Sequence, residues 1–135
     1  PSHHYPTGLV MPIARRQQLL SWAREAPGRC ILEDDYDSEF RFVGRPIPTL
    51  RSIDRADRVI YMNTFTKTIS PAIRTGYMLL PKKRATELKA KISFYSCTVP
   101  TYDQYVLAEY LNSGAFERYI NRVRRKRRQE RKKLI

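Results

Sequence analysis

Two short apolar segments enclose a polar loop near the middle of the sequence, and this feature constrains the fold most. Residues 58–62 are mostly β-branched or aromatic and contain no breaker, so they are expected to form a buried strand, and residues 73–80 are expected to form another. The loop between them holds one lysine, Lys67, beside three threonines. A lysine just past a buried strand tends to lose hydration, and a desolvated, neutral amine is a nucleophile toward carbonyls. A solvated loop lysine without a role is the alternative.

A cluster of carboxylates follows a second apolar segment. Residues 30–32 are expected to form a strand that leads into residues 33–37, where four of the five side chains are carboxylates. Such a cluster is costly unless a cation lies nearby. Because open α/β sheets bind ligands at the carboxyl ends of their strands, the cluster and Lys67 are expected at the same edge. A carboxylate facing a pyridinium nitrogen and a lysine in a Schiff base are the two groups that pyridoxal phosphate (PLP) chemistry requires.

Four segments together resemble one protein family. They are residues 1–8 (PSHHYPTG), 33–40 (EDDYDSEF), 44–48 (GRPIP) and 64–77, which runs from TFTK to RTGY. The sequence resembles the large domain of fold-type I PLP proteins, which have the aminotransferase class I fold. It is most similar to the effector domain of MocR-type regulators, a branch of the GntR transcription factors. The resemblance covers nearly the whole chain and implies that the chain is a fragment of such a protein.

The resemblance implies a fold class and a division of the chain. The fold would be α/β, part of a three-layer PLP-transferase large domain with a mostly parallel sheet and flanking helices, ending in a long basic helix. Residues 1–113 would belong to that large domain, and residues 114–135 would form the helix that leads toward a small C-terminal domain. Because the sequence has no initiator methionine, we expect the chain to begin inside a longer protein.

The resemblance also assigns roles to residues around the cofactor. Lys67 would be the catalytic residue and form the Schiff base with PLP, Asp34 would pair with the pyridine nitrogen, and Tyr36 would donate a hydrogen bond to the phenolate oxygen. Tyr5 takes the place of an asparagine of ordinary aminotransferases and would face the same oxygen, which favours the MocR-like branch. Asp35 alternates to the other side of the strand, and we expect it to be a solvated or capping carboxylate.

A phosphate site is expected beside Lys67. Arg74 follows Lys67 by seven residues, and the planar fork of an arginine matches phosphate oxygens. Thr64 and Thr66 offer hydroxyl groups at the same strand end. By resemblance, these three residues would hold the cofactor phosphate. A surface ion pair is the alternative for Arg74.

These expectations lead to one main function and one alternative. The main interpretation is a PLP-binding, aminotransferase-like effector domain of a MocR/GntR-type transcriptional regulator, which senses an amino acid or PLP through Lys67. DNA would be bound by a missing upstream domain, and the full-length protein would be a homodimer. The alternative is a fragment of a PLP-dependent amino-acid aminotransferase. In either case the chain alone is expected to have little catalytic activity.

The helices are predicted from their apolar stripes. Residues 12–26 place Leu20 and Ala23 on one side and Arg16 on the other, and residues 48–53 are expected to form one helical turn. Helices are also expected at residues 81–95, at 101–111 and from 115 to the end.

Composition excludes several classes of protein. No run approaches the ~20 apolar residues of a membrane span, and the start of the chain has no signal-peptide core. Cys30 and Cys97 are expected to be reduced, buried thiols of a cytoplasmic protein. The adjacent His3 and His4 would point apart on a strand and have no third ligand, so no metal site is expected.

The end of the chain is strongly basic. Ten Lys or Arg residues against one Glu give residues 118–135 a net charge of +9, out of +13 for the whole chain. Such a helix can bind nucleic acid or an anionic surface. We favour the other interpretation, in which these arginines and lysines are solvated or paired with acidic residues outside the chain.

Overall fold

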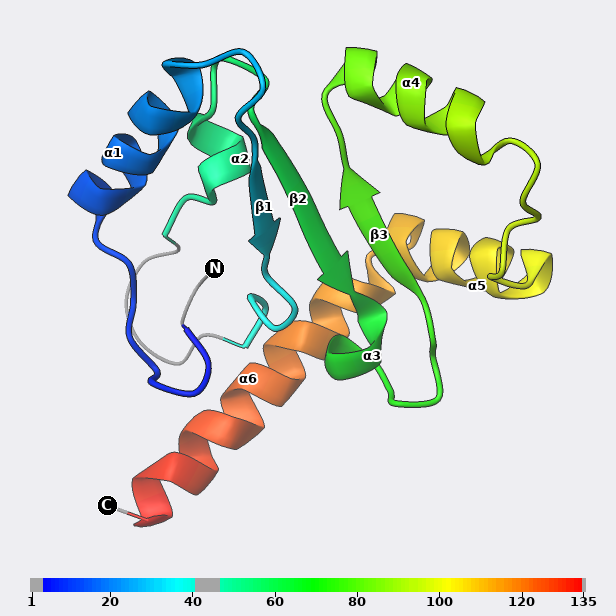
Figure 1. Cartoon of the computed structure of the whole chain (residues 1–135). Helices are drawn as coiled ribbons and strands as arrows, with labels where there is room; N and C mark the ends of the chain where they lie inside the picture. The colour runs from blue at the N-terminus through cyan, green and yellow to red at the C-terminus, as the bar shows by residue number, and fades with distance from the viewer. Residues whose placement is uncertain (1–3, 41–46, 135) are drawn as a thin grey trace. The chain divides into compact units, whose positions relative to one another are not determined.

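The computed structural model describes residues 4–40 and 47–134 and shows an α/β arrangement, as predicted (Figure 1). The chain divides into two compact units: the first comprises residues 1–38 and 46–95, and the second comprises residues 39–45 and 96–135. Much of the segment 44–48, which contributed to the resemblance, lies outside the described residues. The described elements are α1 (Ile13–Arg24), β1 (Ile31–Asp34), α2 (Leu50–Ile53), β2 (Val59–Thr64), α3 (Phe65–Thr68), β3 (Gly76–Leu79), α4 (Lys82–Ile92), α5 (Thr101–Asn112) and α6 (Ala115–Leu134).

The sheet of the first unit has the strand order β1-β2-β3. β1 and β2 are parallel, with Ile31 opposite Val59 and Asp34 opposite Met62. β2 and β3 are antiparallel, so the sheet is mixed. The parallel pairing needs a crossover connection, and this connection contains α2. It places the carboxyl ends of β1 and β2 at the same edge of the sheet.

The core of the first unit lies between two helices and one face of the sheet. Leu20 of α1, Leu50 of α2 and Val59 of β2 are buried together, and Ile31 and Ile53 pack against them. Every second residue of β2 is buried, because alternate side chains point to this covered face. On the opposite face Leu32 is 61 % exposed. The helix-covered face is therefore the interior of this unit.

The polar side of α1 differs from the sequence-based prediction. Arg16 was expected on the solvent side, but it is buried. Its Nε donates to the Met11 carbonyl at 3.1 Å and its guanidinium donates to the Pro48 carbonyl at 2.9 Å. The aliphatic part of a long arginine side chain packs well in a core when its donors find acceptors. Arg16 consequently joins α1 to the segment before α2.

Other expectations about burial were also wrong in part. Cys97 is exposed and Cys30 is half-buried, so neither is the fully buried thiol that was predicted.

The helix predicted for residues 81–95 is present as α4, but it contributes no buried residue. The single helical turn predicted within residues 48–53 is present as α2, and Thr49 caps it by accepting from the Ser52 amide at 3.0 Å.

The second unit consists mainly of α5 and α6. Leu107 of α5 and Ile120 of α6 are buried. The rings of Tyr110 and Phe116 meet edge to face with their centroids 6.1 Å apart. Gly114 separates the helices with φ +69°, a backbone conformation that favours glycine, and its amide donates to the Leu111 carbonyl at 3.2 Å. This ending of α5 allows α6 to begin directly afterwards.

Candidate functional site

The predicted site begins at the edge of the sheet where the carboxyl ends of β1 and β2 lie. Asp34 is the last residue of β1 and pairs with Met62, two residues before the end of β2 at Thr64. Because the two strands are parallel, both segments leave the sheet at the same edge. Asp34 is exposed. The structure therefore brings the carboxylate segment and the lysine segment to one edge, as expected from the sequence.

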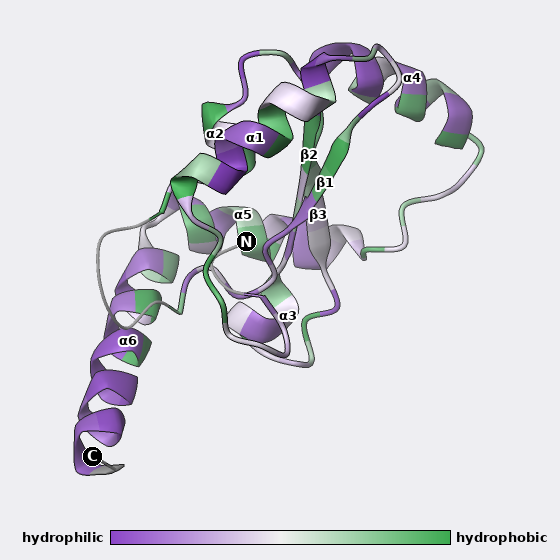
Figure 2. Ribbon diagram, turned by 60° about the vertical axis from the view of Figure 1, so that its left-hand side comes forward, coloured by the Kyte–Doolittle hydropathy of each residue, from purple (hydrophilic) through white to green (hydrophobic). Residues whose placement is uncertain are grey.

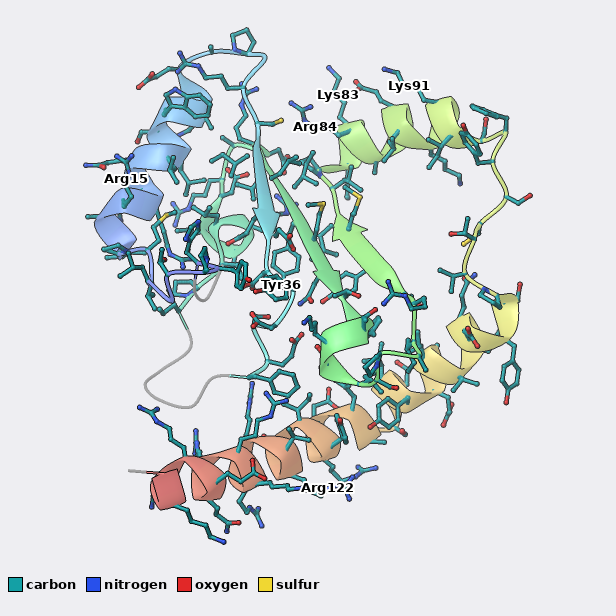
Figure 3. All side chains as sticks on the ribbon, turned by 60° about the horizontal axis from the view of Figure 1, so that its bottom comes forward. Arg15, Tyr36, Lys83, Arg84, Lys91 and Arg122 are labelled. Carbon is teal, nitrogen blue, oxygen red and sulfur yellow. The ribbon has the colours of Figure 1, made fainter. Side chains whose placement is uncertain are left out.

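The aromatic side of the site is formed by Tyr36 and Tyr5. Tyr36 lies in the turn that follows β1 (Figure 3). Desolvation raises the pKa of the Tyr36 phenol above its usual value, and the nearby charges of Asp37, Asp34 and the Tyr5 phenol act in the same direction. The Tyr5 side chain is exposed. Residues 5–7 form a turn, closed by a hydrogen bond from the Gly8 amide to the His4 carbonyl at 2.7 Å.

The hydroxyl side of the site is held together by hydrogen bonds across the loop. Thr66 Oγ1 donates to the Ile73 carbonyl at 2.7 Å, and the Phe65 amide donates to the Thr75 carbonyl at 2.9 Å. Thr64 Oγ1 lies 3.0 Å from Thr66 Oγ1. Both acceptor carbonyls flank Arg74 in the chain, so the backbone of Arg74 is held beside the two threonines. The Arg74 side chain itself is exposed.

Lys67 lies in α3, the short helical turn that follows β2 directly. Thr64 caps this turn by accepting from the Thr66 amide at 3.2 Å, and the neighbouring Thr68 is buried. The Lys67 side chain is exposed, whereas its position after a strand led us to expect shielding from water. The sequence therefore predicted that Lys67 follows a strand, but not that its side chain contacts solvent.

The burial of Asp35 differs from the sequence-based prediction. It was expected to be a solvated or capping carboxylate, yet only 1 % of it is exposed. Tyr61 donates its phenol hydrogen to Asp35 Oδ2 at 3.2 Å, and Asn63 Nδ2 donates to the Tyr61 oxygen at 3.0 Å. Burial raises the pKa of Tyr61 to about 12, so the phenol stays a donor at neutral pH. The alternation of the strand, which carries Asp35 to the covered face, was the available signal.

Glu33 forms a second buried polar cluster on the same face. Its two carboxylate oxygens accept from the amides of Leu50 at 2.8 Å and Arg51 at 2.9 Å, which are the first two residues of α2. The Arg16 guanidinium lies 3.9 Å from Glu33 Oε1, and both side chains are almost fully buried. Glu33 thus connects β1, α1 and α2 directly behind Asp34. This role of Glu33 was not predicted from the sequence.

The basic helix α6 has two different sides. Its apolar residues lie toward the interior of the second unit, with Ile120 buried and Phe116 and Val123 half-buried. Beyond them Arg127 stacks on the Phe40 ring at 4.3 Å, and the helix becomes almost uniformly hydrophilic (Figure 2). A shallow hollow of about 530 Å³ lies along its polar side, lined by Asn121, Arg124, Arg125, Arg128, Gln129 and Lys132.

Residues 4–40 and 47–134 contain no group of three His, Cys, Asp or Glu side chains placed to hold a metal ion. His3, which was weighed as a ligand, lies outside the described residues. Among the helices that the structure describes, none has the length and apolar character that crossing a membrane requires.

Sequence comparison relates the chain to transcriptional regulators. It is 44 % identical over 97 % of its length to the uncharacterized HTH-type transcriptional regulator YdeL of Bacillus subtilis. It is 42 % identical over 93 % to the HTH-type pyridoxine biosynthesis transcriptional regulator PdxR of Corynebacterium glutamicum. It is 38 % identical over 93 % to the probable rhizopine catabolism regulatory protein MocR of Rhizobium meliloti. The chain spans 25–28 % of the length of these relatives.

Structure comparison relates the chain to aminotransferases. The kynurenine aminotransferase of Pyrococcus horikoshii, solved in complex with PMP, matches 89 % of this chain with a TM-score of 0.79 and 33 % identity; the match covers 30 % of that protein. The α-aminoadipate aminotransferase LysN of Thermus thermophilus, solved with N-(5'-phosphopyridoxyl)-L-leucine, matches 96 % with a TM-score of 0.79 and 31 % identity, over 33 % of its own length.

A protein-family model agrees with both comparisons. The model described as aminotransferase class I and II matches residues 1–135, the whole of the sequence. The matched structures are PLP aminotransferases, and the mixed sheet with flanking helices fits part of their α/β domain. The chain therefore belongs to the aminotransferase class I and II family and has part of its PLP-dependent fold.

Proposed function

We propose that this chain is part of a PLP-binding, aminotransferase-like effector domain in a MocR-type transcriptional regulator. The observation that carries this proposal is that more than nine-tenths of the chain is similar to two proteins named as HTH-type transcriptional regulators and to a third named as a probable regulatory protein. In the whole protein, an HTH domain would bind DNA, and this domain would sense an amino acid or PLP. A cytoplasmic homodimer is part of the same proposal.

The side chains at the strand edge fit the cofactor. Asp34 offers a carboxylate, which stabilises a protonated ring nitrogen, and Tyr36, two residues further along the chain, and Tyr5 offer phenols that can donate hydrogen bonds. Arg74 offers guanidinium donors for phosphate oxygens, and hydrogen bonds hold its backbone segment beside the hydroxyl groups of Thr64 and Thr66. We propose that these residues hold PLP and that Lys67 binds it covalently through Nζ. When bound, PLP supplies an electron sink for the α-carbon of an amino acid.

The regulator and the aminotransferase alternative are distinguished by one pair of measurements on the full-length protein. DNA binding is measured by fluorescence anisotropy with the promoter fragment next to its gene, in the presence of PLP and of single amino acids. Transamination is measured with the same amino acids and a keto acid. A regulator is expected to show an effector-dependent change in DNA affinity of about fivefold or more, without turnover. Turnover without an effector-dependent change in DNA binding would support the aminotransferase.

The role of Asp34 is tested by Asp34→Asn in the full-length protein. The amide keeps the shape of the side chain and removes the charge, so the fold is expected to remain and the ring nitrogen is expected to lose its stabilised proton. We expect the visible spectrum of the bound cofactor to shift. We also expect the response to amino acids to be weaker than that of the parent by about tenfold or more.

The matched control for Asp34 is Asp103→Asn on α5, which removes the same charge from another exposed carboxylate. Far-UV circular dichroism of all three proteins checks the fold. If Asp34→Asn gives the parent spectrum and the parent response to amino acids, the proposed role of Asp34 is wrong.

A further inference from the structure

A continuous network of buried polar side chains lies next to the proposed cofactor site, on the covered face of the sheet. Asp35, Tyr61 and Asn63 are each less than a tenth exposed. The Tyr61 phenol donates to Asp35 Oδ2 at 3.2 Å and accepts from Asn63 Nδ2 at 3.0 Å. Asn63 Nδ2 also lies 3.5 Å from Ser38 Oγ. None of these residues has a role in the cofactor binding proposed above.

This buried network connects the two segments that carry the site. On the β1 side, Asp35 stands between Asp34 and Tyr36 in the chain, and its amide donates to the Met62 carbonyl at 3.0 Å. On the β2 side, Asn63 Oδ1 accepts from the Thr64 amide at 2.6 Å. Thr64 in turn caps the helical turn that contains Lys67. The network is therefore a side-chain link between the carboxylate segment and the lysine segment.

The pattern of donors and acceptors fixes the orientation of each side chain in the network. Asn63 directs its amide nitrogen at two oxygens and its amide oxygen at an N–H donor. Tyr61 directs its hydrogen at a carboxylate, and the phenol keeps that hydrogen at neutral pH. Buried networks with complementary donors and acceptors are rigid, and an unmatched member is costly. A change at one end is consequently expected to alter the position of the other end.

We propose that Asp35, Tyr61 and Asn63 are positioning residues that hold the Asp34–Tyr36 segment at a set distance from the Thr64–Lys67 segment. This inference rests on the proposed function. In that proposal PLP is held by Asp34 and Tyr36 on one segment and is bonded to Lys67 on the other, so its binding depends on the distance between the two segments. It adds a supporting layer on the covered face of the sheet, opposite to the face on which Asp34 lies.

The test uses Tyr61→Phe in the full-length protein, a change that removes one oxygen and keeps the ring. We expect the dissociation constant for PLP to rise about tenfold, because the Asp35 carboxylate loses a donor and the segment shifts. We also expect the midpoint of the pH titration of the visible cofactor band to rise, since a displaced Tyr36 stabilises the ring phenolate less. Tyr95→Phe is the matched control, because Tyr95 is an exposed tyrosine of the same unit.

A second pair of variants separates positioning from simple loss of stability. Asp35→Asn keeps an oxygen that accepts from Tyr61 and is expected to stay within about threefold of the parent affinity, whereas Asp35→Ala is expected to lose about tenfold or more. If Tyr61→Phe does not fold, this pair decides the proposal. Equal affinities for PLP in Asp35→Asn and Asp35→Ala, or in Tyr61→Phe and the parent, would overturn it.

A cofactor-free measurement keeps this inference distinct from the proposed function. Amide hydrogen exchange without PLP is expected to show faster exchange at residues 64–68 in Tyr61→Phe than in the parent and in Tyr95→Phe. If the parent shows no lysine-linked cofactor, the proposed function fails, and the exchange result still decides whether the network holds this segment. Unchanged exchange at residues 64–68 contradicts the network under either outcome.

Discussion

Lys67→Ala is expected to abolish the covalent bond between the full-length protein and PLP. Lys67 directly follows the edge at which β1 and β2 end, beside the Thr64 and Thr66 hydroxyls. An amine is the group that forms a carbon–nitrogen bond with the aldehyde carbon, and alanine has none. The visible band that borohydride reduces should therefore be lost completely. The measurement is absorbance before and after borohydride, followed by peptide mass spectrometry to locate the reduced adduct.

Lys83→Ala is the matched control for this experiment. Lys83 is an exposed lysine on α4 in the same unit, so its substitution removes the same charge away from the strand edge (Figure 3). The control should keep the parent band, with the adduct on the peptide that contains Lys67. An unchanged reducible band in Lys67→Ala would show that another amine binds the cofactor, and the assignment of Lys67 would be wrong.

Glu33→Ala is expected to have the largest effect on stability. The Glu33 carboxylate accepts from two amides at the start of α2, and it is the buried carboxylate beside the Arg16 guanidinium. Alanine leaves both amides short of an acceptor and removes the compensating charge from a buried arginine. Breaking a buried pair in this way costs about 3–5 kcal/mol of the free energy of unfolding. Denaturant unfolding of the full-length protein, followed by circular dichroism, measures the change.

Two further variants make the Glu33 experiment specific. Glu25→Ala breaks an exposed ion pair with Arg29, in which the Glu25 side chain is 64 % exposed, and should cost no more than about 1 kcal/mol. Glu33→Gln keeps one acceptor oxygen and should have an effect between those of the two alanine variants. A loss in Glu33→Ala as small as that in Glu25→Ala would mean that the buried cluster does not stabilise the fold.

The local features of the fold could be predicted from the sequence because neighbouring residues determine them. Apolar β-branched runs predicted the strands that became β1 and β2, and apolar stripes predicted the longer helices. The end of each strand then placed Asp34 and Lys67 at one edge, because parallel strands end on the same side. Family resemblance supplied the roles of these residues, and those roles remain predictions.

The burial of charged residues was decided only by the tertiary structure. Arg16, Glu33 and Asp35 were expected in solvent or were given no role, yet all three are buried. Each depends on partners distant in the chain: Pro48 for Arg16, the start of α2 for Glu33, and Tyr61 for Asp35. A charged side chain is stable in the interior only when such partners surround it, and sequence periodicity contains no information about partners that the fold brings from elsewhere.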